Sequence, residues 1–167
     1  MNLQLAGEIM LSRKIIAASI SGTLFAILLG FVMPHPFGEQ EIVAEQNYFY
    51  SASTIIFLYL IYSFPVILIY GVITSIISDK VALYWSKKSR NKKIEMLASG
   101  VLHIVFGLVL LPYSLGASVL FFVTDKLLQK RNITLHSLQA IKSLLIPLTI
   151  GIISLGIVWV EHFINNS

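Results

Sequence analysis

The sequence predicts an all-α protein, a polytopic transmembrane bundle of five helices in one domain of 167 residues. Only 12% of the residues are charged, against about 25% in a typical soluble domain. Hydrophobic residues make up 56% of the chain and are gathered into long charge-free runs. Runs of that length suit helices that cross a bilayer. This composition excludes a soluble enzyme domain, a disordered tail and a nucleic-acid-binding module.

The first predicted span covers residues 15–33 and directly follows Arg13 and Lys14. Its length corresponds to a helix of about 28 Å, close to one hydrocarbon thickness. A signal peptide is the alternative, but those usually end in a small-residue cleavage site. Residues 33–36 read Met-Pro-His-Pro and contain no such site, so we expect an uncleaved span. Translation could begin at the first residue or at Met10.

An acidic segment follows the first span and contains His35, Glu39, Glu41 and Glu45. These residues could hold a cation, but their spacing matches neither a calcium loop nor a zinc motif. We therefore expect a solvated outer loop and no bound metal.

The second predicted span covers residues 52–77, within a charge-free run from Gln46 to Ser78. Pro65 lies inside it and should kink the helix, because proline lacks an N–H group and its ring clashes with the preceding turn. The stretch 79–93 then carries six Lys and Arg residues and is the most polar part of the chain.

The next charge-free run, from Met96 to Thr124, supports two topologies. As a single helix kinked at Pro112 it would be about 43 Å long, which gives a bundle of four spans. As a hairpin it would form two short spans, about 95–111 and 113–128, ahead of a last span at 143–160. The turn-like sequence around Pro112 and Gly116 favours the hairpin.

The distribution of positive charge also favours the hairpin. Basic residues flanking spans stay mainly on the cytoplasmic side of a membrane. Five spans place all twelve Lys and Arg residues on that side, with the N-terminus inside and Ser167 outside. Four spans would put Lys126, Lys130, Arg131 and Lys142 outside. We therefore expect a multi-pass protein of the cell membrane whose inner face contacts anionic lipids.

Two segments share a pattern: PVILIYGVITSIISDK from Pro65 and PYSLGASVLFFVTDK from Pro112. Each runs from a proline through an apolar stretch to an Asp-Lys pair, which is a second reason to place Lys126 inside. With FFVTDKLL, this layout resembles the small multi-pass membrane proteins common in Gram-positive bacteria. The resemblance implies a membrane bundle, and it supplies no activity and no site residue.

A ridge of small residues recurs every four positions along the first span, at Ala18, Gly22, Ala26 and Gly30. Such a ridge lets a neighbouring backbone approach closely. We expect it to pack inside the protein, with a dimer as the alternative.

Three polar residues are candidates for a functional role. His103 is the one titratable residue well inside a predicted span, where it can hydrogen-bond a neighbouring helix or relay protons. Asp79 and Asp125 each end a helix running toward the cytoplasm. They are either solvated carboxylates or an ion-paired gate joining the two helix ends, with Lys80, Lys126, Arg90 or Lys92 as partners.

Catalytic, cofactor and metal motifs are not found in the sequence, and we expect no enzyme. No Asp, Glu, Lys or Arg lies deep in a predicted span, whereas proton-coupled transporters usually need one. We therefore expect a non-enzymatic accessory protein, of envelope-stress or immunity type, with a membrane-protein partner or a second copy of itself. The alternative is a small oligomeric transporter or channel.

Overall fold

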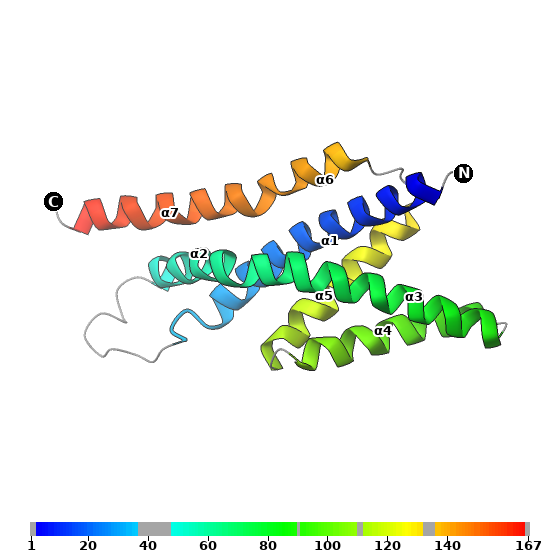
Figure 1. The fold of residues 1–167 in the computed structure, drawn as a ribbon. Coiled ribbons are helices and arrows are strands. Elements are labelled where there is room, and N and C mark those ends of the chain that lie inside the picture. Colours follow the sequence, from blue (N-terminus) through cyan, green and yellow to red (C-terminus); the bar gives the residue numbers. More distant parts are fainter. Residues whose placement is uncertain (1–2, 37–47, 90, 110–111, 132–135, 166–167) are drawn as a thin grey trace.

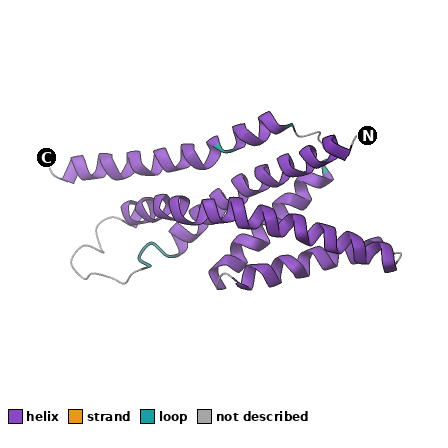
Figure 2. Ribbon diagram, in the orientation of Figure 1, coloured by secondary structure: helices purple, strands orange, loops and turns teal. Residues whose placement is uncertain are grey.

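The computed structural model describes residues 3–36, 48–89, 91–109, 112–131 and 136–165. These residues form helices with short connections and contain no strand (Figure 2). In chain order the elements are α1 (Leu3–Val32), α2 (Tyr48–Val66), the π-helical turn η1 (Ile67–Gly71), α3 (Val72–Ser89), α4 (Lys92–Val109), α5 (Pro112–Lys130), α6 (Ser137–Ser143) and α7 (Leu145–Asn165).

The helices combine into five rods that alternate in direction (Figure 1). The segments α2, η1 and α3 join into one continuous helix, and α6 runs into α7 through a turn at Leu144. We call the end where α3 meets α4 the inner end, and the end where α1 finishes and α2 begins the outer end. The chain starts at the inner end and finishes at the outer end (Figure 1). The predicted five-helix all-α bundle is confirmed. The long kinked third helix of the alternative is not formed, because α4 and α5 turn back and pack against each other as a hairpin.

The long central helix passes through Pro65 without a break. Proline cannot donate the hydrogen bond that an α-helix requires at its position. The chain forms the π-helical turn Ile67–Gly71 directly after it. Such turns interrupt the regular bonding pattern of an α-helix while the helix continues. The irregular segment lies beside α1 and α5, where it lines the pocket described below.

The α4–α5 hairpin ends short of the outer end of the bundle (Figure 1). A β-carbon on Gly116 of α5 would lie 3.6 Å from the ring of Phe25, so these two positions are level. From Phe25, α1 continues for seven residues to Val32, which is about 10 Å of helix, whereas α5 begins four residues beyond Gly116, which is about 6 Å. The outer part of the bundle is therefore built by α1, α2 and α7, with the hairpin tip below it.

The ridge of small residues lies against the long central helix. A β-carbon on Gly22 would lie 2.9 Å from the ring of Phe64, and one on Gly30 would lie 3.2 Å from the backbone nitrogen of Ile56. Ala18 and Ala26 are fully buried. The ridge therefore packs inside the protein, and it brings the backbones of α1 and α2 close together.

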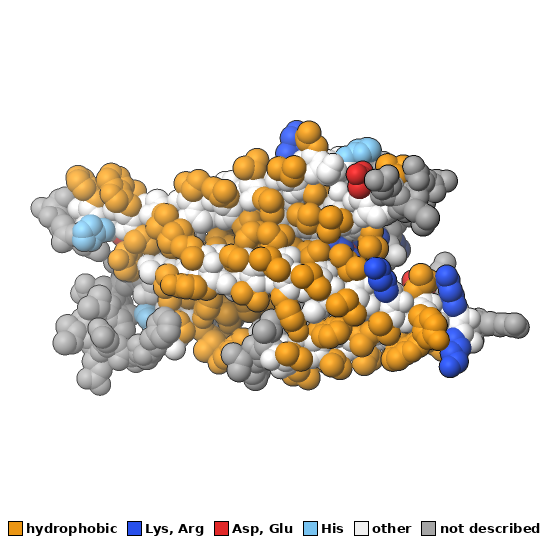
Figure 3. All heavy atoms as spheres, in the orientation of Figure 1, with side chains coloured by type: hydrophobic (Ala, Val, Ile, Leu, Met, Phe, Trp, Pro, Cys, Tyr) orange, Lys and Arg blue, Asp and Glu red, His pale blue; other side chains and the backbone are white. Residues whose placement is uncertain are grey.

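Three helical segments are long and apolar enough to cross a membrane, judged by length and composition: Gly7–Val32, Tyr48–Ser89 and Ser137–Ile164. Hydrophobic side chains cover most of the face seen in Figure 3, and basic side chains gather at the end of α3. The first segment begins earlier than the predicted span and contains Arg13 and Lys14, and the second contains Asp79. The helical segments that could cross a membrane by length and composition therefore include these three charged residues. Glu39, Glu41 and Glu45 of the predicted outer loop lie outside the described residues.

Candidate functional site

An ion cluster of Arg13, Lys14, Asp79, Asp125 and Lys126 lies toward the inner end of the bundle. Five further residues of α5 and ten of α3 extend beyond its two carboxylates toward that end. The ten residues of α3 correspond to about 15 Å of helix. The cluster is therefore enclosed by the bundle and does not lie at the helix tips.

Lys14 is the centre of the cluster, and its side chain is 0% exposed. Its ammonium group lies 2.5 Å from Asp79 Oδ2, 2.6 Å from Asp125 Oδ2 and 2.6 Å from Ser75 Oγ. An ammonium group has three protons to donate, so these three acceptors saturate it. Burying a charge is costly unless it is paired and hydrogen-bonded in this way. Lys14 thereby ties α1 to both α3 and α5.

Asp125 is as deeply buried as Lys14, with a side chain that is 1% exposed. Its second oxygen, Oδ1, accepts a hydrogen bond of 2.9 Å from Arg13 Nε. Both carboxylate oxygens of Asp125 are thus paired with bases from α1. Adjacent residues on a helix point about 100° apart, so Arg13 and Lys14 reach this carboxylate from two directions.

Asp79 collects partners from three helices besides its own. Its Oδ1 accepts hydrogen bonds from Ser99 Oγ of α4 at 2.9 Å and from Lys126 Nζ of α5 at 3.1 Å. Its Oδ2 binds Lys14 and lies 3.6 Å from a guanidinium nitrogen of Arg13. Within the ion cluster, three cations therefore face two carboxylates, which leaves an excess of one positive charge.

Helical spacing explains how the sequence assembles this cluster. Ser75 and Asp79 are four residues apart on the long central helix, as are Ser99 and His103 on α4. Residues at that spacing share one face of a helix, so each pair points toward the same neighbours. The α4 pair meets the α3 pair directly: Ser99 bonds Asp79, and His103 bonds Ser75.

His103 connects the ion cluster to the interior of the bundle. Its Nδ1 lies 2.8 Å from the carbonyl oxygen of Ser99. A carbonyl only accepts, so Nδ1 carries the proton. In the neutral ring, Nε2 then accepts from the hydroxyl of Ser75 at 3.1 Å, and that hydroxyl accepts from Lys14. The ring is also held between Phe121 and Phe122, with centroids 6.2 Å and 5.2 Å away.

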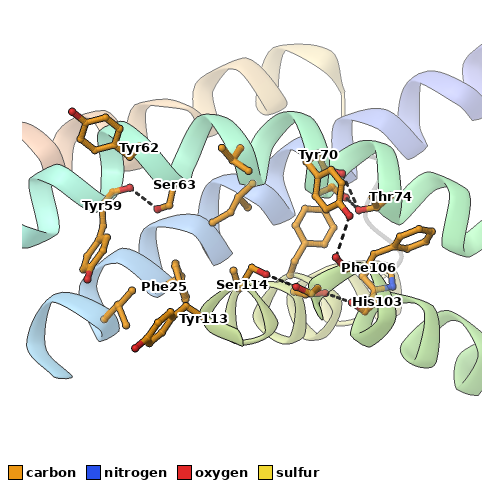
Figure 4. Close-up of a pocket in the computed structure, with 18 of the residues that line it drawn as sticks. Phe25, Tyr59, Tyr62, Ser63, Tyr70, Thr74, His103, Phe106, Tyr113 and Ser114 are labelled. Carbon is orange, nitrogen blue, oxygen red and sulfur yellow. Dashed lines mark hydrogen bonds between the residues drawn. The ribbon is translucent and has the colours of Figure 1, made fainter. Parts of the chain in front are cut away.

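A pocket of about 440 Å³ lies on the outer side of the ion cluster, between α1, the long central helix and the hairpin. Figure 4 shows Tyr59 and Tyr113 at one end of the pocket and His103 at the other. Met33 and Pro36 also line the pocket, at the outer end. The pocket runs along the hairpin, whose two helices line it from Tyr113 to Phe121 and from His103 to Gly107. Thr74, His103 and Phe121 form its inner end, and the ion cluster lies directly behind His103.

The structure corrects what the sequence indicated for Asp79 and Asp125. The reading of both as solvated carboxylates is wrong, because Asp125 is buried and both are ion-paired. The partners also differ from those expected. Lys126 pairs with Asp79 instead of with its neighbour Asp125, and the other two bases are Arg13 and Lys14, whose place in the sequence indicated only the topology. Lys80 is exposed, and Arg90 and the side chain of Lys92 lie outside the described residues.

The other candidates take structural positions around the cluster and the pocket. Gly22, Ala26 and Gly30 of the ridge pack against the long central helix. Gly107, one turn beyond His103, lies where a β-carbon would be 2.8 Å from Ser118. It therefore allows α4 and α5 to pack closely beside the pocket.

Within the part of the chain that the structure describes, no group of three or more His, Asp or Glu side chains is placed to hold a metal ion. Comparison with known proteins gives no match to a family model, a curated protein or a solved structure.

Proposed function

We propose that the protein is a non-enzymatic multi-pass protein of the plasma membrane that acts as an accessory factor of the cell envelope, of stress or immunity type. In this proposal the N-terminus lies in the cytoplasm and the C-terminus outside. Its partners are the anionic lipids of the inner leaflet and a larger membrane protein.

The orientation is supported by the basic side chains. Lys80, Lys87, Lys88 and Lys93 are exposed around the junction of α3 and α4, which is the inner end. Exposed bases beside apolar helices favour the cytoplasmic side of a membrane. The termini lie at opposite ends of the bundle (Figure 1), which agrees with an odd number of crossings.

The observation that carries the accessory role is the ion cluster behind the inner end of the pocket. Both carboxylates are engaged by several donors, and Lys14 has no proton left to donate. Carboxylates held in this way are poorly placed for acid–base chemistry on a bound molecule. The residues that line the pocket extend no further toward the inner end than Thr74, His103 and Phe121, so the pocket stops short of the ion cluster. The arrangement suits a protein that holds a fixed shape or a bound molecule.

A transporter is the second candidate, and one observation favours it. The hydrogen-bond chain His103–Ser75–Lys14 runs from the pocket into the ion cluster. Such a chain is a possible proton path, and an ion-paired closure is a device that an opening transition could release.

Two measurements test the proposal. Liposomes that contain the purified protein and an internal pH dye should stay as tight to protons as empty liposomes under an imposed membrane potential. A protein-dependent proton flux would establish the transporter in place of the accessory factor. Cells that lack the protein should be more sensitive to membrane-active peptides, and the intact gene should restore resistance. Unchanged sensitivity to such peptides and to cell-wall antibiotics would contradict the envelope role.

A further inference from the structure

We propose that the pocket binds an uncharged, lipid-soluble molecule that carries a hydroxyl group. This inference deepens the proposed function, because it names the kind of molecule that the bundle would hold. It rests on the lining of the pocket, the charge behind it, the state of its hydroxyl groups and the place where it opens.

The lining excludes a charged ligand. Of the described residues that line the pocket, none is Asp, Glu, Lys or Arg. Aromatic rings provide much of the wall, including Phe25, Tyr59, Phe106 and Phe121. An ionised group placed among them would lose its water without gaining a partner, which is strongly unfavourable. A volume of about 440 Å³ is in the range of sites for small organic molecules.

Aromatic pockets also bind cations through ring faces, but the charge behind this pocket opposes a cation. The ion cluster lies directly behind His103 and contains one more cation than carboxylates. Its excess positive charge acts through a region of low dielectric, where electrostatic repulsion is strong. A cationic ligand is therefore disfavoured, and we expect the ligand to be neutral.

Three of the hydroxyl groups that line the pocket indicate a group that the ligand can offer. Tyr70 donates to the carbonyl of Phe106 at 3.1 Å, Thr74 to that of Tyr70 at 2.8 Å, and Ser118 to that of His103 at 2.5 Å. A hydroxyl has one proton and two acceptor positions. These oxygens therefore present acceptor sites, and a neutral ligand matches them when it brings a donor. A hydroxyl group meets that requirement.

The open side of the pocket indicates where the ligand comes from. Tyr62, Val66 and Tyr113 line the pocket and are 73%, 46% and 59% exposed. They place the opening on the side of the bundle between α2 and the hairpin. In a bundle that crosses a membrane, side chains exposed at this level face lipid. The ligand therefore enters from the membrane, and it must be lipid-soluble.

Four probes with the same prenyl tail test the chemistry on the full chain in detergent. Farnesol is neutral with a hydroxyl, farnesyl methyl ether lacks the donor, farnesylamine is cationic and farnesoic acid is anionic. Farnesol should raise the midpoint of thermal unfolding by about 3 °C near saturation. The ether should give at most half of that shift, and the amine and the acid should give none. Equal shifts with all four probes, or the largest shift with the amine, would overturn the proposal.

Matched variants on the long central helix locate the site. Ser63 and Thr54 are half-buried, and each donates its hydroxyl to the carbonyl four residues earlier, but only Ser63 lines the pocket. Ser63→Phe should abolish the farnesol shift, and Thr54→Phe should leave it. A shift that survives Ser63→Phe would place binding elsewhere.

A second pair tests the acceptor oxygens. Thr74→Val should weaken the affinity for farnesol about fivefold, which corresponds to the loss of one hydrogen bond, and should leave the affinity for the ether unchanged. Thr54→Val should change neither affinity. Equal affinity of the two variants for farnesol would contradict a hydrogen bond from the ligand's hydroxyl group to the oxygen of Thr74. If Ser63→Phe does not fold, the comparison of the four probes on the native chain still tests which chemistry the pocket binds. Because these experiments measure binding directly, their result does not depend on the result of the proton-flux and peptide-sensitivity tests of the proposed function.

Discussion

Lys126 is paired with Asp79, 47 positions away on another helix, although Asp125 is its neighbour in sequence. Asp125 instead bonds Arg13 and Lys14 of α1. This exchange of partners joins α1, α3 and α5 at a single level of the bundle. It makes the charges of the inner half of the bundle depend on one another.

Asp125→Asn should destabilise the protein strongly. The change leaves the buried Lys14 with one carboxylate, and breaking a buried ion pair from one side costs about 3–5 kcal/mol. Glu8 is an exposed carboxylate on α1, so Glu8→Gln serves as the control and should stay within about 0.5 kcal/mol of the native chain. Thermal unfolding in detergent compares the two variants, and equal midpoints would remove the ion cluster from the account of stability.

The cost of losing Lys14 and the cost of losing Asp125 should not add. Lys14→Met leaves two carboxylates with fewer donors, and Asp125→Asn leaves the ammonium group with Asp79 as its one remaining carboxylate. The double variant removes both charges together, which relieves part of each penalty. A double-mutant cycle should therefore give a coupling of about 1–3 kcal/mol. Additive effects within about 0.3 kcal/mol would show that the two groups do not act as a pair.

Gly30→Ala should destabilise the protein more than Gly156→Ala. A β-carbon at Gly30 would overlap Ile56 and come within 3.3 Å of the carbonyl oxygen of Ala52, whereas nothing lies within 4 Å of one at Gly156. Because the obstacle includes backbone, the helices must separate, at a cost of about 1–3 kcal/mol. Unfolding midpoints of the two alanine variants provide the measurement. A Gly30 variant as stable as the Gly156 variant would show that α1 and α2 are not tightly packed there.

The topology can be read by labelling, because the native chain contains no cysteine. Ser137 and Ile164 are exposed and lie at the two ends of the α6–α7 rod. An impermeant thiol reagent added to intact cells should label Ile164→Cys and spare Ser137→Cys. Labelling of Ser137→Cys alone would place the C-terminus in the cytoplasm and reverse the proposed orientation.

The fold was predictable where the sequence carried a one-dimensional signal. The count of Lys and Arg residues on either side of each apolar run favoured the hairpin, as did the turn-like sequence around Pro112, which marks the start of its second helix. The ridge from Ala18 to Gly30 was visible because its spacing alone defines a helix face.

The ion cluster was only half predictable. Asp79 and Asp125 stood out as carboxylates at the ends of apolar runs, but the nearest bases in sequence were the wrong partners. Pairing depends on how each helix is rotated about its axis, and that rotation is set by packing. The available signal was that Arg13 and Lys14 begin another apolar run at the same end. The pocket had no signal of its own, because it forms between helices that lie far apart in the sequence.

The position of Lys14 on α1 also constrains the order in which the protein can be completed. Its acceptor Asp125 is 111 residues further along the chain, so α1 is synthesised long before that carboxylate exists. Until α5 has been added, the ammonium group can find Asp79 but lacks half of its final anionic partners. A chain that is interrupted after α3 therefore keeps an incompletely neutralised charge in its first helix. Final closure of the bundle must wait for the synthesis and docking of the hairpin.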